Sequence, residues 1–321
     1  MTVFQTAEYR EAYAAIFGRG KRFHSLDVPG AQVWLQSRGI TARRLEMWGQ
    51  GIADCGGAQL EKESSVAALW SEIEALSASC HGAQFSQIEA NSPLVACAEA
   101  ANWQISEAET CPVLSFPDNY DAYVKSLGKN MREQIKRYPK RLEKEFEVEY
   151  QLARTETEME TALENLFALH GKRWRARGQP GVLALPSRRK FHRLVGEKFL
   201  ENNWLRLWTL RCNGRPACVL LSYFWGGKYW FFIGGFEPDL MRWSVGTCLF
   251  ARVFQSAIEE GAREFDFLRG AEEYKYRFGA VNRDYVNLSW FAPTPRGKLL
   301  GRRVGLENAF TKRLHEKFGA S

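Results

Sequence analysis

Apolar residues recur along the chain at two periodicities, and in the first third they predict an alternation of helices and strands. Spacings of three and four residues indicate helices, whereas apolar and polar residues that alternate indicate strands. The helices are expected at residues 4–17, 64–79 and 93–102, and the strands at 32–38, 40–48, GAQFSQIEA and ISEAETCPVLSF. The first two strands pair around Gly39. This series predicts an α+β unit without an evident catalytic constellation.

The rest of the chain predicts a second series built in the same order. A strand, FEVEYQLA, precedes two helices, at 156–178 and 187–202. Three strands follow, WLRLWTLRC, PACVLLSYFW and KYWFFIGGF, and the turn signals Asn213-Gly214 and Gly226-Gly227 make them an antiparallel meander. The series ends with the helix WSVGTCLFARVFQSAIEEG, the strand EFDFL, the helix AEEYKYRF and the strand RDYVNLSWFAP.

A basic segment connects the two series. Residues 118–147 predict one long helix that starts at a cap, Asp118 or Asn119, and Pro139 is expected to kink or end its first stretch. Its cations are Lys125, Lys129, Arg132, Lys136, Arg137, Lys140, Arg141 and Lys144. They outnumber its glutamates, so the helix is either a solvated connector or an anion-binding face.

These elements predict an α+β protein of two similar units, each with a mixed, mostly antiparallel sheet flanked by helices. A length of 321 residues suits two domains of ordinary size. We expect an N-terminal unit at 1–117, the basic linker helix at 118–147 and a C-terminal unit with the active site at 148–321.

The composition is that of a soluble globular protein, with 45% hydrophobic and 25% charged residues. No apolar run is long enough for a membrane helix, and the charged start is unlike a signal peptide, so we expect a cytoplasmic protein. The seven cysteines are scattered without metal spacing, which predicts buried reduced thiols and no metal. A net charge of +7 suits an anionic partner such as CoA, nucleic acid, a membrane surface or an acidic polymer.

Four sequence blocks carry a family resemblance. They are SFPDNYDAYVKSLGKNMREQIKR, LHGKRWRARGQPG, GGFEPDLMRWSVG and DFLRGAEEYKYRFGA. Together with the strand order, they resemble the CelD/BcsL type of acetyltransferase in the GNAT superfamily, which is associated with cellulose and exopolysaccharide biosynthesis. The resemblance implies an acyltransferase that takes acetyl-CoA or another acyl-CoA and an amine or hydroxyl acceptor, such as a small molecule or a saccharide precursor.

The resemblance leaves two rivals open. Related proteins with paired GNAT units include the Fem-type transferases, which use aminoacyl-tRNA, and for such an activity the basic helix would follow phosphates. A non-catalytic binding component of a polysaccharide system is the third alternative.

In this resemblance the donor lies where KYWFFIGGF and EFDFL splay apart. The backbone of Phe232, Ile233 and Gly234 would bond the pantetheine arm. The pyrophosphate would meet the start of the next helix, where the implied contacts are Arg242, Ser244, Val245, Gly246 and Thr247. This loop has an extra residue before Gly246 compared with the family pattern and lacks the second small residue. Without the resemblance, Ser244 would be an ordinary helix cap.

Candidate catalytic residues follow the strand EFDFL. Asp266 or Glu272 is the expected base, Tyr274 the proton donor to the thiolate, and Lys275 the charge that stabilises the oxyanion or the acyl donor. For Asp266 a structural ion pair with Arg269 or Arg242 is the alternative. No Ser or Cys sits in a nucleophile elbow, which favours direct transfer in a ternary complex.

A second group of candidates shares one helix face, at the i, i+3, i+4 and i+7 positions. It consists of His170, Arg173, Trp174 and Arg177, a set that suits a phosphate- or sugar-bearing acceptor and is equally typical of helix-to-sheet packing. His170 is a further candidate base, and Tyr229 and Arg269 complete the predicted acceptor contacts.

The tail PRGKLLGRRVGLENAFTKRLHEKFG alternates basic and apolar residues. It predicts a terminal helix that either packs with a solvated basic face or touches an anionic membrane surface.

Overall fold

The computed structural model describes residues 1–176 and 178–318, and the side chains of 310–318 are outside that description. The chain forms two compact units that are interleaved in sequence. Unit 1 comprises Met1–Cys111, Arg269–Glu273 and the segment from Asn282 onward, and unit 2 comprises Pro112–Leu268 and Tyr274–Val281. The expected boundaries differ from this division because the C-terminal segment joins the N-terminal unit.

Unit 1 is a mixed sheet with helices on both faces. Its strands are β1 (Lys21–Val28), β2 (Ala31–Arg38), β3 (Arg44–Met47), β4 (Gln59–Leu60), β5 (Gly82–Glu89), β6 (Gln104–Glu107) and β14 (Tyr285–Phe291). Its helices are α1 (Ala7–Phe17), α2 (Val66–Ala78), α3 (Pro93–Ala100) and α10 (Pro295–Phe318), with short 3₁₀ turns at Val3–Gln5 and Glu63–Ser65. The sheet order is β1-β2-β3-β5-β14-β6, with β4 on β2, and β3 and β5 are parallel.

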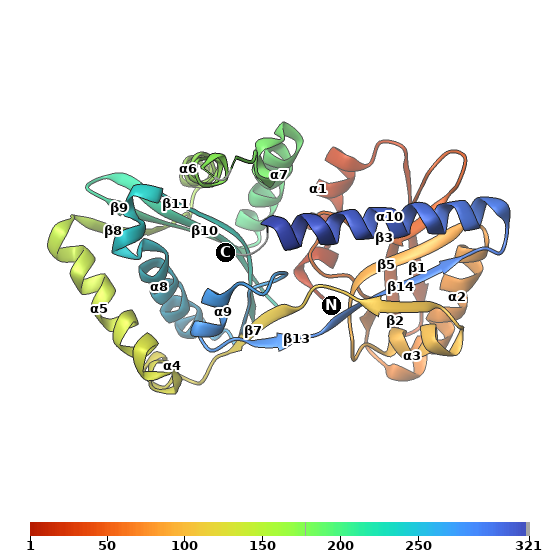
Figure 1. Ribbon diagram of the computed structural model, residues 1–321. Coiled ribbons are helices and arrows are strands. Elements are labelled where there is room, and N and C mark those ends of the chain that lie inside the picture. Colours follow the sequence, from red (N-terminus) through yellow and green to blue (C-terminus); the bar gives the residue numbers. More distant parts are fainter. Residues whose placement is uncertain (177, 319–321) are drawn as a thin grey trace. The chain divides into compact units, whose positions relative to one another are not determined.

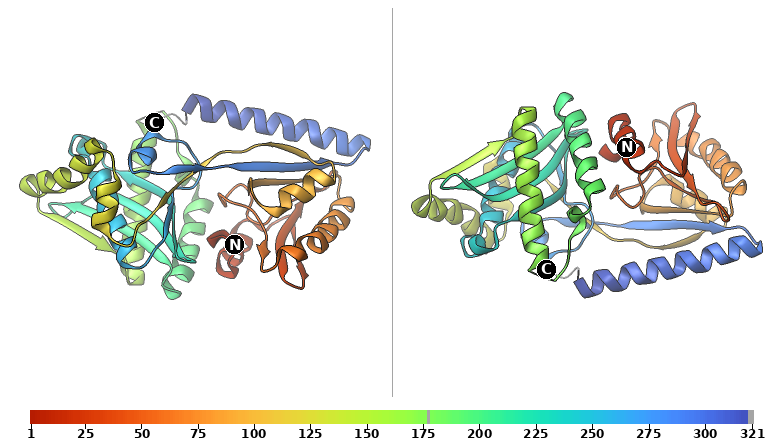
Figure 2. Two further views of the ribbon diagram at one scale, coloured as in Figure 1. Left: turned by 90° about the horizontal axis from the view of Figure 1, so that it is seen from below. Right: turned by 90° about the horizontal axis from the view of Figure 1, so that it is seen from above.

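Helix α10 attaches to the sheet of unit 1 through polar contacts. Arg44 Nη1 lies 3.0 Å from the carboxylate of Glu307, and Arg44 Nε lies 2.7 Å from Glu46. Glu46 is 2% exposed and also accepts a hydrogen bond from Gln36. Leu300 and Val304 bury the apolar side of this single continuous helix (Figure 2). The packed terminal helix that the sequence predicted is therefore confirmed.

Unit 2 carries the second series of elements. Its strands are β7 (Cys111–Ser115), β8 (Val148–Leu152), β9 (Leu205–Cys212), β10 (Arg215–Trp225), β11 (Lys228–Phe236), β12 (Glu264–Asp266) and β13 (Val281–Arg283). Its helices are α4 (Tyr120–Ser126), α5 (Lys129–Glu145), α6 (Glu156–Arg175), α7 (Pro186–Glu201), α8 (Val245–Glu259) and α9 (Glu273–Arg277), with 3₁₀ turns at Val182–Ala184 and Pro238–Trp243. The sheet order is β13-β7-β12-β11-β10-β9-β8.

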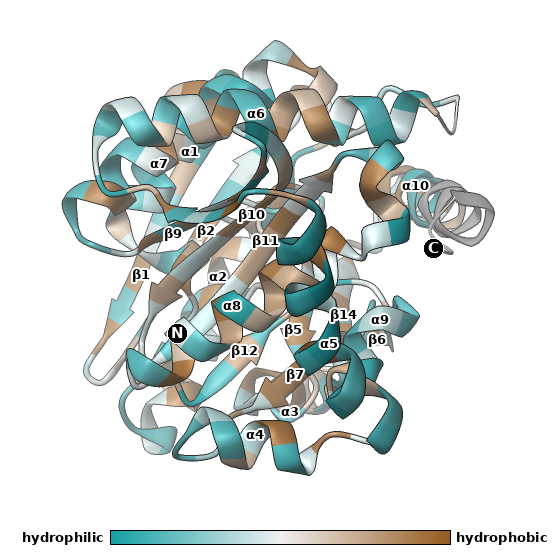
Figure 3. Ribbon diagram, turned by 90° about the vertical axis from the view of Figure 1, so that its left-hand side faces the viewer, coloured by the Kyte–Doolittle hydropathy of each residue, from teal (hydrophilic) through white to brown (hydrophobic). Residues whose placement is uncertain are grey.

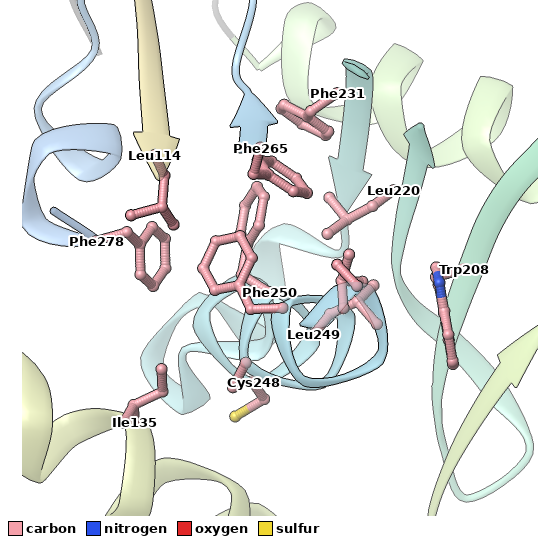
Figure 4. Packing of buried hydrophobic residues seen from close by; sticks show 14 of the residues in the cluster. Leu114, Ile135, Trp208, Leu220, Phe231, Cys248, Leu249, Phe250, Phe265 and Phe278 are labelled. Atoms are coloured by element: carbon pink, nitrogen blue, oxygen red, sulfur yellow. The ribbon is translucent and has the colours of Figure 1, made fainter. Parts of the chain in front are cut away.

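Two helical layers cover this sheet. Helices α6 and α7 lie on one face and α5 and α8 on the other (Figures 1 and 3). Between α8 and the sheet lies an aromatic core, in which Phe250 contacts Phe265 and Phe278 (Figure 4). Phe254 packs against Phe250 and Phe265 in the same core. Burial of such large rings stabilises the strand–helix–strand unit that positions the site.

The basic segment is two helices, not one. Asn119 Oδ1 accepts a hydrogen bond from the amide of Ala122, so Asn119 caps α4, and α5 starts after Gly128. Helix α5 then continues through Pro139, which was expected to kink or end it. Met131, Ile135 and Leu142 hold α5 in the core of unit 2. Tertiary packing therefore outweighs the lost hydrogen bond at the proline.

Two predicted strands have other partners than expected. ISEAETCPVLSF is not one strand, because β6 and β7 belong to different sheets. RDYVNLSWFAP supplies β14, which pairs with β5 and β6 in unit 1. The other helices and strands expected from the sequence occur close to their predicted bounds, and the sequence missed β1, an eight-residue strand.

Candidate acyl-transfer site

Strands β11 and β12 separate as the donor site requires. They are parallel and pair only from Lys228↔Glu264 to Trp230↔Asp266 in the described registers. The β10–β11 register shifts between Leu221 and Ser222, so Phe232 is an extra residue in a β-bulge. The part of β11 after Trp230 therefore presents an edge with backbone groups that an extended ligand can use.

Helix α8 begins beside this edge with an open first turn. Its cap residue Ser244 has the left-handed φ of 55° and makes no side-chain cap hydrogen bond. A Cβ on Gly246 would meet nothing within 4 Å. The first amides of a helix lack intrahelical acceptors and attract anions. The extra residue in the loop is thus accommodated by a 3₁₀ turn and a left-handed Ser244.

A cation from α5 reaches the same place. Arg141 Nη2 donates a 2.6 Å hydrogen bond to the carbonyl of Arg242, and its guanidinium lies 5.0 Å from the Trp243 ring. Arg242 is exposed and stacks on the same indole. The start of α8 is therefore lined by two arginines and an aromatic plane, groups suited to a phosphate and a base. Sequence reasoning missed Arg141 because it belongs to another helix.

Asp266 and Lys275 are buried around one residue, Leu268. Asp266 is 0% exposed, and its Oδ1 accepts a 2.8 Å hydrogen bond from the Leu268 amide. Lys275 is 2% exposed, and its Nζ lies 3.5 Å from the Leu268 carbonyl. This burial and the bond to the Leu268 amide favour a structural role for Asp266.

Arg269 and Glu272 are grouped with unit 1. Two guanidinium nitrogens of Arg269 donate to Asp54 Oδ1, at 2.8 and 2.5 Å. Burial lowers the pKa of Arg269, but Asp54 and Glu109 outweigh it and hold that pKa above its usual range. The carboxylate of Glu272 folds over Gly270, where a Cβ would lie 2.6 Å from it. The predicted acceptor contact of Arg269 is thus used within unit 1.

Two predicted tyrosines pack into the core. Tyr229 was expected to contact the acceptor, but it is 0% exposed and its ring stacks on Phe265. The ring of Tyr274 lies against Phe250 and Phe267 at centroid distances of 5.8 and 6.2 Å. The pattern of apolar and polar residues does not show how side chains pack, and this packing determines where both tyrosine rings lie.

Two histidines meet on the other face of β11. His170 is 3% exposed and stands beside the Trp174 ring, while His192 is 2% exposed and lies 4.9 Å from the Phe232 ring. Burial and Arg173 lower the pKa of His170 to about 4. Burial, Arg188 and His170 lower the pKa of His192 to about 3.

The remaining members of the predicted helix face are distributed differently. The guanidinium of Arg173 stands over Phe236 at 5.2 Å, which fits helix-to-sheet packing. Arg177 lies outside the described residues. A shallow hollow lined by Arg175, Gly178, Gln179, Pro180 and Ala184 adjoins the end of α6.

The described residues give three further facts, on metal sites, membrane-spanning helices and cysteines. Within 1–176 and 178–318, no group of three or more His, Cys, Asp or Glu side chains could hold a metal ion. None of the helices in these ranges is both long and apolar enough to cross a bilayer. All seven cysteines are free thiols, and burial raises the pKa of Cys248 to about 12.

Comparisons with known proteins agree with this geometry. Residues 129–276 match the family model of the acetyltransferase (GNAT) domain. A search of curated proteins finds no matching sequence.

Solved structures extend the likeness to both units. The crystal structure of FemX is similar with a TM-score of 0.71 at 10% identity, over 93% of this chain and 94% of that one. The structure of L-PGS from Bacillus licheniformis is similar with a TM-score of 0.59 at 13% identity, over 92% and 95%. The C-terminal domain of a proposed lysylphosphatidylglycerol synthetase from Agrobacterium fabrum has a TM-score of 0.59 at 13% identity, over 92% of each chain. The double-GNAT fold is thus confirmed; the CelD/BcsL type stays a prediction.

Proposed function

We propose that the protein transfers an acyl group from acyl-CoA to an amine or hydroxyl acceptor. The observation that carries this proposal is the parting of β11 from β12 beside the open start of α8. An extended amide chain fits the free β11 edge, and a diphosphate fits helix amides flanked by Arg141 and Arg242. The match of residues 129–276 to the GNAT domain supports the same reaction class.

The reaction is a direct transfer in a ternary complex. The acceptor nitrogen or oxygen bonds to the thioester carbonyl carbon while its proton passes to a base. The tetrahedral intermediate then collapses, the C–S bond breaks, and the thiolate leaves with a proton from a donor or solvent. The β11 backbone amides near the bulge are candidates to stabilise the oxyanion. A saccharide or exopolysaccharide precursor remains our proposed acceptor on the sequence resemblance alone.

Gly246 allows a clean test of the donor site. Apart from its chain neighbours and its own helix backbone, a Cβ there meets no atom within 4 Å, so we expect Gly246→Val to disturb the protein little but to crowd a diphosphate at the helix start. We expect acetyl-CoA affinity, measured by calorimetry, to fall at least tenfold, about 1.4 kcal/mol. The control is Gly305→Val, a helical glycine with equally open space in α10. Equal affinity in both variants would remove the start of α8 from the site.

A second donor deserves a test because α5 presents a row of exposed cations. Arg132, Lys136, Lys140 and Lys144 recur every fourth residue on its outer side. The fold likeness to FemX spans 93% of the chain, so an aminoacyl-tRNA donor is the alternative. If tRNA binds here, affinity should fall steeply with salt and further in Lys136→Gln/Lys140→Gln. Acetyl-CoA binding without tRNA binding rejects this alternative.

A further inference from the structure

Residues His170 and His192 lie together on the face of the sheet opposite α8. Both residues are almost fully buried, with exposed fractions of 3% and 2%. Helices α6 and α7, which carry the two histidines, pack against each other, and His170 contributes to the lowered pKa of His192. The charged neighbours that act on the pair are Arg173 and Arg188, both cationic. The pair therefore stays neutral at physiological pH.

The two rings also have unused hydrogen-bonding atoms. Nδ1 of His170 and Nδ1 of His192 are buried and have no hydrogen-bond partner among the described residues. A buried polar atom left without a partner costs about 1–3 kcal/mol. Two such atoms on adjacent helices are therefore costly for folding, and a ligand with N–H or O–H groups would satisfy them.

The location of the pair connects it to the donor edge. His192 packs on Phe232, the residue of the β11 bulge. The main chain at His170 comes so close to β11 that a Cβ on Gly235 would lie 2.7 Å from its amide nitrogen. Both helices thus sit over the segment of β11 that extends past β12. Gly181 lies against the rings of His170 and Trp174, since a Cβ on Gly181 would lie 2.8 Å from His170 Cε1 and 2.8 Å from Trp174 Cγ.

We propose that this imidazole pair is the proton-accepting end of the acceptor site, with His170 as the catalytic base and His192 as a positioning residue. The acceptor is a neutral amine or a hydroxyl whose proton passes to Nδ1 of His170 as its nitrogen or oxygen bonds to the thioester carbon. The C–S bond then breaks, the thiolate departs, and the imidazolium returns its proton to the thiolate or solvent. The inference rests on the proposed acyl transfer and takes His170 as the base in place of Asp266, because Asp266 Oδ1 already accepts a hydrogen bond from the Leu268 amide.

The test uses the full chain with acetyl-CoA and hydroxylamine as a small acceptor, with acetohydroxamate as the product measured. His170→Asn keeps a polar atom near the Nδ1 position but cannot act as a base, so the turnover number should fall about 100-fold or more. Acetyl-CoA affinity by calorimetry should stay within twofold. His192→Asn should raise the KM for hydroxylamine more than it lowers the turnover number. His24→Gln, in unit 1, is the matched control and should leave both unchanged.

Chemical rescue separates a base from a structural ring. In His170→Ala, added imidazole should restore turnover in proportion to its concentration; if this variant does not fold, His170→Asn decides. Full turnover in His170→Asn, or a wild-type protein that binds acetyl-CoA but forms no hydroxamate, overturns the inference while the donor proposal stands. A wild-type protein that fails to bind acetyl-CoA refutes the proposed function itself.

Discussion

Replacement of Gly235 by alanine should lower the stability of unit 2, because the new Cβ would overlap helix α6. A Cβ at this position would lie 2.7 Å from the His170 amide nitrogen, 3.1 Å from Leu169 Cβ and 3.2 Å from the Leu169 carbonyl carbon. Two of these atoms are helix backbone, so no side-chain rotation can relieve the overlap. Helix α6 must move away from β11.

The size of the effect follows from overpacking of well-packed interiors, which costs about 1–3 kcal/mol. For a unit of this size that corresponds to a fall in melting temperature of about 2–12 °C. Two other glycine substitutions serve as references for the loss of stability in Gly235→Ala. Gly234→Ala meets first the end of a flexible side chain, Leu220 Cδ2 at 2.7 Å, and should cost less. Gly246→Ala meets nothing within 4 Å and should change stability by no more than about 0.5 kcal/mol.

Thermal and urea unfolding followed by circular dichroism measure all three variants. We expect the order Gly235→Ala, Gly234→Ala, Gly246→Ala from least to most stable. Because α6 carries His170, Gly235→Ala should also reduce hydroxamate formation. A Gly235→Ala protein as stable as Gly246→Ala would refute the close approach of α6 to β11, and with it the placement of His170.

Three further outcomes are expected. Acid should destabilise the protein, because the pKa values of His170 and His192 are lowered to about 4 and about 3 in the folded state. The contribution of these neutral histidines to the free energy of unfolding is complete above the unfolded pKa near 6.5 and is lost as the pH falls toward 4. For His170 the fall of the pKa from about 6.5 to about 4 corresponds to about 3 kcal/mol of stability. Urea unfolding at pH 7 and pH 4.5 should therefore show a smaller loss in His170→Asn/His192→Asn. Asp266→Asn should cost about 1–3 kcal/mol in urea unfolding, because Asp266 is fully buried and the neutral amide oxygen accepts the hydrogen bond of the Leu268 amide more weakly than the carboxylate does. An unchanged midpoint would contradict this. Leu299 and Leu306 are 66% and 73% exposed on α10, near Arg302 and Arg303, so the protein should co-sediment with phosphatidylglycerol vesicles. Leu299→Ser/Leu306→Ser should weaken this co-sedimentation, whereas the control Leu185→Ser should not. If the protein does not co-sediment, α10 is a packed helix with a solvated face.

Local periodicity was sufficient to predict most elements, because each helix and strand of unit 2 has its own apolar face. It could not assign partners. RDYVNLSWFAP has the same strand pattern whichever sheet it joins, and only the structure shows β14 between β5 and β6. Pro139 similarly predicts a break that the buried Ile135 and Leu142 override.

The site was predictable in outline and less so in its residues. The resemblance predicted the donor site at the β11 edge and the start of α8, where the structure has a short β11–β12 pairing and a helix start without a side-chain cap. Both features depend on chain order. The resemblance could not predict the direction of the side chains. Tyr229 and Tyr274 pack against the aromatic core, and Arg269 donates a hydrogen bond to Asp54, 215 positions away in the sequence. His192 lacked companions within its own helix, so no local signal could pair it with His170.

The place of β14 has a consequence for biosynthesis. The ribosome releases β5 and β6 long before the strand that fills the gap between them. At about 5–20 residues per second, the segment from 112 to 281 delays that strand by about 10–30 s, time in which the inserted unit can fold. During this interval the nascent N-terminal sheet exposes two strand edges that invite mispairing with other chains. Its partners in the cell at that stage are therefore expected to be chaperones, and expression yield should depend on them more than for a protein whose domains follow one another.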